Sequence, residues 1–128
     1  RLALATGDLD AAVAELDEAV AGLSGRDDRE HTLFLAARAE AVAARDPAGA
    51  LRDLDCAIAR ARLAGWPDVL ASTLCGRSRT LRDPRDLVEA EAIADQLGSP
   101  PGSRLRRDLA RTRSVLASVQ PRHTEAER

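Results

Sequence analysis

The sequence has few aromatic side chains and lacks four common residue types altogether. One Trp and one Phe are the only aromatic residues among 128, and Lys, Asn, Met and Tyr are absent. Because aromatic residues are so scarce, a folded core has to be built from Ala, Leu and Val. The codons of the four missing types are rich in A and T, which indicates a GC-rich bacterial genome. Because Met is missing, we expect this chain to be a piece of a longer protein.

Long apolar runs and closely spaced cysteines are missing as well. No stretch of apolar residues is long enough to span a bilayer, and no positively charged leader precedes an apolar signal segment. The two cysteines, Cys56 and Cys75, have neither CxxC spacing nor the density of a secreted disulfide scaffold. These absences favour a cytoplasmic protein that does not contact a membrane.

Motifs that carry catalysis or bind cofactors do not occur in the sequence. HExxH, GxSxG and the Gly-rich phosphate loop are absent. The two histidines, His31 and His123, form no Cys-plus-His arrangement with supporting spacing. Both cysteines are interpreted as small packing residues. We therefore expect no enzymatic activity, no metal and no cofactor.

Residues that favour helices dominate the sequence. Ala, Leu, Arg and Glu are abundant, and no stretch alternates in the way that is typical of strands. The sequence predicts an all-α fold of about six or seven helices. Asp46-Pro47 has the form of a helix start, and Gly65 and Gly98 have the form of helix ends. The expected helices, after the end of one in residues 1–6, are 9–23, 30–44, 47–63, 67–81, 84–97 and 103–120.

One segment of the sequence occurs twice. Residues 7–20 recur as residues 45–58, an offset of 38, with small and branched residues at matching positions. The turn Arg45-Asp46-Pro47 recurs as Arg82-Asp83-Pro84, at an offset of 37 residues. The second of these turns belongs to a third copy that matches the other two less well. A period of this size predicts stacked helical units, none of which buries its apolar face alone. The predicted apolar positions are Ala12, Val13, Leu16, Ala19, Val20, Ala50, Leu51, Leu54, Ala57, Ile58, Leu87, Ala90, Ala94 and Leu97.

The first copy resembles the tetratricopeptide repeat, a helix–turn–helix unit of about 34 residues. Gly7-Asp8-Leu9 matches the Gly-Asp-Tyr turn of that family, and Ala12 and Ala19 match its small positions. Arg38 and Arg45 depart from the family, which has a small residue and a turn glycine at those positions. The resemblance implies an α-solenoid of antiparallel helix–turn–helix repeats. Its parts would be repeats in residues 1–98, the first one truncated, a turn and capping helix in 99–121, and a disordered tail in 122–128.

The same resemblance implies a protein–protein interaction module. Ala- and Arg-rich repeats of this kind resemble regions of large bacterial transcription regulators and signalling ATPases. The first helix of each unit would line a concave wall that binds a peptide, a helix or a neighbouring domain of the same parent chain. Flanking repeats or a second copy of the chain could instead cover this wall. The wall lacks the Lys and Asn residues with which some family members clamp the carboxylates of chaperones, which excludes that ligand. The expected partner-binding residues are Leu35, Ala39, Val42, Val69, Ser72 and Arg79.

The last predicted helix offers an alternative function. Arg104, Arg107 and Arg111 could neutralise the phosphates of a nucleic acid. The arginines of this helix spread over two sides, however, and no aromatic residue lies among them for base stacking. These two observations favour the solvated outer face of a capping helix. A small-molecule effector pocket in the solenoid is a third hypothesis.

Overall fold

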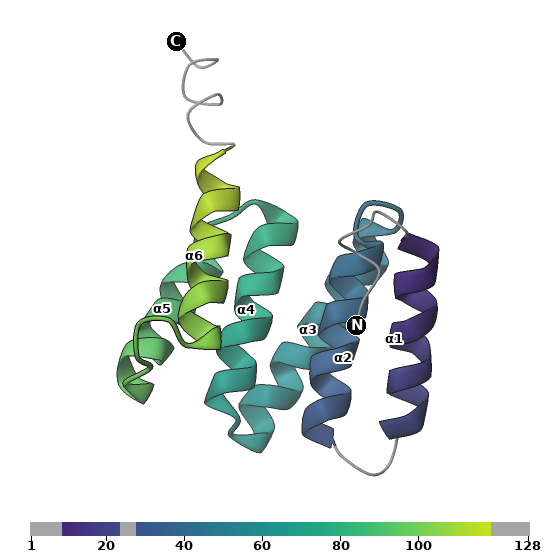
Figure 1. Ribbon diagram of the computed structural model, residues 1–128, viewed down its shortest axis with the longest axis horizontal. Helices are drawn as coiled ribbons and strands as arrows, with labels where there is room; N and C mark the ends of the chain where they lie inside the picture. The colour runs from purple at the N-terminus through teal and green to yellow at the C-terminus, as the bar shows by residue number, and fades with distance from the viewer. Residues whose placement is uncertain (1–8, 24–27, 119–128) are drawn as a thin grey trace.

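Six α-helices and no strand make up the residues that the computed structural model describes, 9–23 and 28–118. The all-α prediction is confirmed. The helix end expected in residues 1–6 and the tail expected in residues 122–128 lie outside the described residues. The helices, shown in Figure 1, are α1 (Leu9–Leu23), α2 (Asp28–Val42), α3 (Pro47–Ala64), α4 (Pro67–Leu81), α5 (Arg85–Leu97) and α6 (Arg104–Ala117).

The helix ends follow local signals in the sequence. Pro47 opens α3 directly after Asp46, whose carboxylate accepts a hydrogen bond from the Gly49 N–H at 3.0 Å. Gly65 and Gly98 end α3 and α5 in the left-handed conformation, where a residue without Cβ is least strained. Ser103 precedes α6, and its hydroxyl accepts a hydrogen bond from a backbone N–H of the first turn. The expected bounds of all six helices lie within three residues of the observed ones.

Each helix packs against the next one in the chain, and α4 also packs against α2 and α6. The helices α2, α4 and α6 therefore form one row. Helix α3 contacts both α2 and α4, and α5 contacts both α4 and α6. Figure 1 shows α1 at one end of the molecule and α5 with α6 at the other.

Most of the apolar positions predicted from the repeat are buried, and they form part of the core. Val13 and Leu51 are half-buried, and the side chains of Ala19 and Val20 lie outside those described. Leu97 is 45% exposed, so its predicted place in the core is wrong. It is the last residue of α5, directly before the Gly98 cap, where the helix ends. The predicted positions that are buried are Ala12, Leu16, Ala50, Leu54, Ala57, Ile58, Leu87, Ala90 and Ala94.

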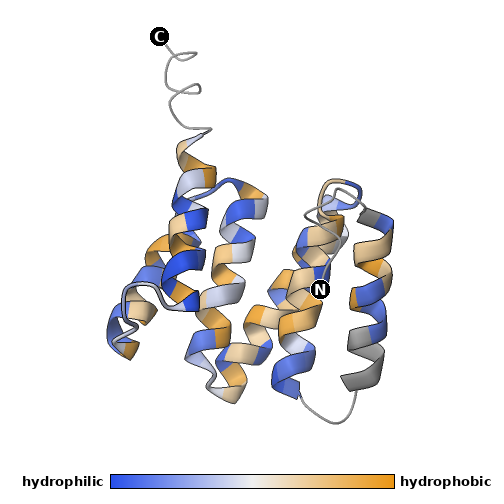
Figure 2. Ribbon diagram, in the orientation of Figure 1, coloured by the Kyte–Doolittle hydropathy of each residue, from blue (hydrophilic) through white to orange (hydrophobic). Residues whose placement is uncertain are grey.

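The core has two parts. A small cluster made mostly of alanines joins α2 to α3, and a larger one joins α3, α4, α5 and α6 around Leu74 and Leu109. Alanine at the contact positions lets neighbouring helices lie close together. Figure 2 shows hydrophobic and hydrophilic residues on the same helices, as expected where each helix buries one side. None of the described helices is both long enough and apolar enough to cross a membrane.

Candidate functional site

A groove of about 760 Å³ runs along the row formed by α2, α4 and α6. Its apolar lining includes Leu33 and Phe34 of α2, Val69 of α4 and Leu105 of α6. Charged side chains from the same three helices lie among these apolar residues. The groove is thus built by α2, α4 and α6 together with Leu16 of α1, and it combines apolar surface with charge.

The structure places the sequence-predicted residues of α4 in this groove. Val69, Ser72 and Arg79 line it, and so does Gly76, which lies between Ser72 and Arg79 on the helix. Ser72 is half-buried, whereas Val69 is almost completely covered. The participation of these residues in partner binding stays a prediction.

The placement of the α2 residues on the groove wall is corrected by the structure. Ala39 is completely buried in the small core cluster, and Val42 packs against the same cluster. Leu35 is half-buried and does not line the groove. The α2 residues that do line it include Leu33 and Ala37.

The error in α2 comes from the spacing assumed between units. The expected positions on α2 and α4 were 37 residues apart, like the two Arg-Asp-Pro turns. The helices themselves begin 39 residues apart, at Asp28 and Pro67. The turn after α4 is shorter than the turn after α2. The spacing between the two turns therefore differs from the spacing between the helices that precede them. A shift of two residues rotates an α-helix by more than half a turn, which moves a side chain to another face.

Arg79 lines the groove and joins α2, α4 and α6. Its side chain is 9% exposed. Nε and Nη2 donate hydrogen bonds to the two carboxylate oxygens of Glu40 on α2, at 2.9 and 2.8 Å. Nη1 donates to Oδ1 of Asp108 and to Oγ1 of Thr112 on α6, both at 2.7 Å. Every side chain in this cluster is therefore held by its neighbours.

The ionisation of this cluster follows from its contacts. Burial lowers the pKa of Arg79, but hydrogen bonds and the charges of Glu40 and Asp108 outweigh burial and raise the pKa above its usual value. Burial also raises the pKa of the nearby Cys75 thiol to about 12, with the charge of Asp108 adding to the effect. The thiol is therefore neutral at physiological pH, as expected for a packing residue. Cys56 is exposed instead, so its predicted packing role is wrong.

Because Gly76 has no side chain, there is room beside α4 for the carboxylate of Glu40. A Cβ atom at position 76 would lie 3.0 Å from Glu40 Oε2 and 3.2 Å from its Cδ. Glycine in the interior of a helix is unfavourable unless packing requires it. The sequence pattern does not mark Glu40, Asp108 or Thr112 as parts of the site. The glycine inside α4 is the one local sign that another group approaches there.

The arginines of α6 fall into two sets. Arg106 donates a hydrogen bond to Asp95 of α5 at 2.9 Å, and Arg113 donates to Glu91 of α5 at 2.7 Å. Arg104, Arg107 and Arg111 instead line the groove and are exposed. Among the residues that the structure describes, these three make no side-chain hydrogen bond or ion pair. One side of α6 is thus tied to α5, and the other presents unpaired positive charge to the groove.

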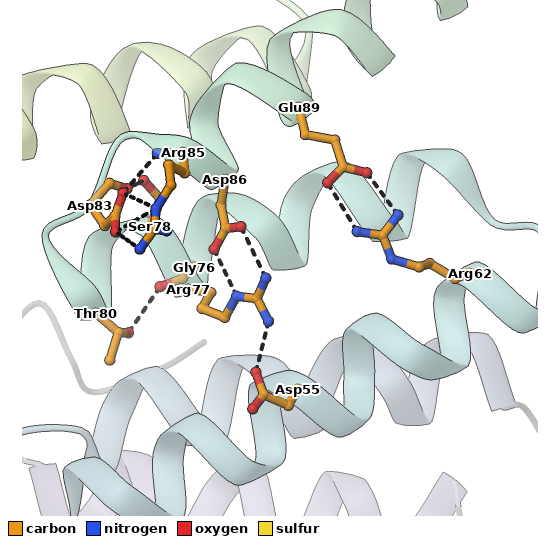
Figure 3. A network of polar contacts seen from close by, with 10 residues as sticks. All are labelled: Asp55, Arg62, Gly76, Arg77, Ser78, Thr80, Asp83, Arg85, Asp86 and Glu89. Carbon is orange, nitrogen blue, oxygen red and sulfur yellow. Dashed lines mark hydrogen bonds and ion pairs between the residues drawn. The ribbon is translucent and has the colours of Figure 1, made fainter.

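The opposite side of α4 carries a network in which the arginines are paired, shown in Figure 3. Arg77 donates two hydrogen bonds to Asp86 of α5, at 2.7 and 3.0 Å, and one to Asp55 of α3, at 2.8 Å. Arg62 binds both oxygens of Glu89, at 2.7 and 2.9 Å, and the hydrogen bond from Arg62 lowers the pKa of Glu89. This network joins α3, α4 and α5 through paired charges.

The described residues contain no group of three or more His, Cys, Asp or Glu side chains that could hold a metal ion. No family model, no curated protein and no solved structure matches the chain.

Proposed function

We propose that the chain is a tetratricopeptide-like α-solenoid that serves as a non-enzymatic protein-interaction module. Its setting would be a larger bacterial regulatory protein of the cytoplasm. The row of α2, α4 and α6 would be the first helices of successive units, and the groove along this row would be the concave face. The partner would be a peptide, a helix or a neighbouring domain of the same parent chain.

Equivalent arginines support the repeat architecture. Arg38 on α2 and Arg77 on α4 are 39 residues apart, the same separation as the starts of the two helices. Arg38 donates hydrogen bonds to Asp17 of α1 and Asp53 of α3, both at 3.0 Å. Arg77 connects α3 to α5 in the same manner. Each arginine thus bridges the helices before and after its own, as expected if one unit recurs along an array.

The observation that carries the interaction function is the combination of apolar and charged residues in the groove. Leu33 and Phe34 of α2 and Leu105 of α6 are half-buried and supply apolar contact area. Exposed apolar surface bordered by charged residues marks binding sites for other proteins in many folded domains. The groove is also held in shape by the Arg79 cluster, so a partner segment would meet a preformed surface.

A charge placed in the middle of the groove tests this function. Ala37→Glu changes a half-buried groove residue of α2, and Ala59→Glu makes the same change at an exposed position of α3 outside the groove. Random peptides of about 16 residues, roughly four helical turns, would be selected on the unmodified chain by display.

The selected peptides should lose roughly tenfold or more in affinity for Ala37→Glu, because a carboxylate would have to be buried against an apolar side chain. Ala59→Glu should bind them as the unmodified chain does. Circular dichroism melts would establish that both variants fold. The proposal is wrong if no peptide is enriched, or if Ala37→Glu binds the enriched peptides at full strength.

Binding of a nucleic acid is the second candidate, favoured by the three unpaired arginines of α6. It predicts that a short DNA duplex binds with an affinity that falls steeply as salt rises, because phosphate contacts release counterions. Replacement of Arg104, Arg107 and Arg111 by Gln should reduce that salt dependence. An affinity that does not change with salt contradicts this candidate.

A further inference from the structure

We infer that the groove selects an acidic, amphipathic segment whose carboxylates pair with Arg104, Arg107 and Arg111. This inference rests on the proposed function, since it assumes that a segment of another protein occupies the groove. It adds the chemistry of that segment and the residues that would recognise it.

The three arginines form a row on one side of α6. Their spacing of three and then four residues places them above one another along the helix. Like charges at this spacing repel each other and destabilise the helix that carries them. Asp108 lies within the row, but its carboxylate already accepts a hydrogen bond from Arg79 at 2.7 Å. The positive charge of the row is therefore not neutralised by its own helix.

The position of the row within α6 adds to its attraction for anions. Arg104 is the first residue of the helix, and no acidic residue occurs in the first turn. The unpaired N–H groups at a helix start carry partial positive charge, which adds to the charge of the arginine side chains. Carboxylates also suit arginine because they can accept two parallel hydrogen bonds from one guanidinium group.

The rest of the groove indicates that a peptide fits better than a nucleic acid. Four carboxylates also line it, those of Glu30 and Asp68 paired with Arg29, and those of Glu40 and Asp108 paired with Arg79. A continuous polyphosphate lying along the groove would meet these carboxylates as well as the arginines. A peptide can place its acidic residues opposite α6 only and its apolar residues against Leu33 and Phe34 of α2.

The spacing of the arginines also sets the spacing of the acids. Arg104 and Arg111 are seven residues apart, which corresponds to about 10 Å along a helix axis. A helical segment lying along α6 would carry acidic residues at positions i, i+3 or i+4, and i+7. Its apolar residues would occupy the adjacent face, as in other amphipathic helices that bind in grooves.

The display experiment described above tests the inference through the composition of the peptides that it enriches on the full chain. We expect peptides with at least two acidic residues at these spacings beside Leu or Phe. Their affinity should fall roughly tenfold or more when Arg104, Arg107 and Arg111 are all replaced by Gln, and should weaken as salt rises. Arg52→Gln is the matched control, because Arg52 is exposed on α3 and lies outside the groove.

The possible results separate this inference from the function on which it rests. If no peptide is enriched, the proposed interaction function itself fails. If neutral or basic peptides are enriched and lose affinity for Ala37→Glu, the function stands and the acidic specificity is overturned. Full affinity of the triple-Gln variant for acidic peptides overturns it too. A short DNA duplex that displaces the enriched peptides, and binds more tightly than they do, would overturn it in favour of nucleic acid.

Discussion

Arg79 is the residue at which three helices meet. Its guanidinium group donates hydrogen bonds to α2 and α6 from a nearly buried position on α4. Among the described residues, no buried side-chain nitrogen or oxygen lacks a hydrogen-bond partner. A buried charge is tolerated only when its partners are in place, so this residue should matter more to stability than the exposed arginines.

Replacement of Arg79 tests its contribution at the level of one residue. Arg79→Met should lower the free energy of unfolding by about 2–4 kcal/mol, because it leaves Glu40 and Asp108 without their shared cation. The partial exposure of those carboxylates, 29% and 19%, keeps the loss below that of a fully buried pair. Urea denaturation followed by circular dichroism measures it. Arg62→Met removes an exposed ion pair and should cost clearly less; equal losses would contradict the role given to Arg79.

At the level of the helix, three C-terminal ends use the same left-handed backbone with different residues. Gly65 after α3 and Gly98 after α5 have φ angles of 73° and 65°. Arg82 after α4 has a φ of 56°, and it is the one residue other than glycine with positive φ in the described part of the chain. An L-amino acid with a Cβ is strained in this conformation, whereas glycine is not.

Exchange of residues at two of these helix ends should therefore change stability in opposite directions. Relief of the strain at position 82 outweighs the added freedom of the unfolded chain, so Arg82→Gly should raise the free energy of unfolding by up to about 1 kcal/mol. Gly65→Ala should lower it by about 1 kcal/mol for the converse reason. Thermal melts of both variants provide the measurement. A lower melting temperature for Arg82→Gly would show that its side chain contributes more than its backbone conformation costs.

At the level of the whole molecule, the two core clusters divide the structure. The smaller one lies between α2 and α3, and the larger one extends from α3 to α6. In an array whose units contact only their neighbours, stability is approximately a sum over units and the interfaces between them. Loss of packing at one end should then lower the local stability mainly at that end.

Leu109→Ala tests this distribution of stability. Leu109 is completely buried in the larger cluster, and its truncation should cost about 2–5 kcal/mol. Hydrogen exchange followed by mass spectrometry should show a large increase in α5 and α6 and a small one in α2 and α3. Leu63→Ala serves as the control, because Leu63 is 92% exposed. A uniform increase over all six helices would mean that the molecule unfolds as one unit and would count against the proposed array.

The amino-acid sequence by itself determined the helices and part of the core. Asp46-Pro47, Gly65 and Gly98 mark helix ends because caps depend on hydrogen bonds and backbone angles within a few residues. Ala50 and Leu54 were identifiable as core because the repeat returns apolar residues at helical spacing.

Only the tertiary structure decided which side chains meet in the groove. Glu40 and Asp108 lie 39 residues before and 29 residues after Arg79 in the sequence. Their pairing depends on the rotation and approach of three helices, and no local preference specifies either. The same holds for the division of the α6 arginines into paired and unpaired sets, since it depends on the side on which α5 packs. A shift of two residues in the assumed spacing was enough to place Ala39 on the groove wall when it lies in the core, because each residue turns an α-helix by about 100°.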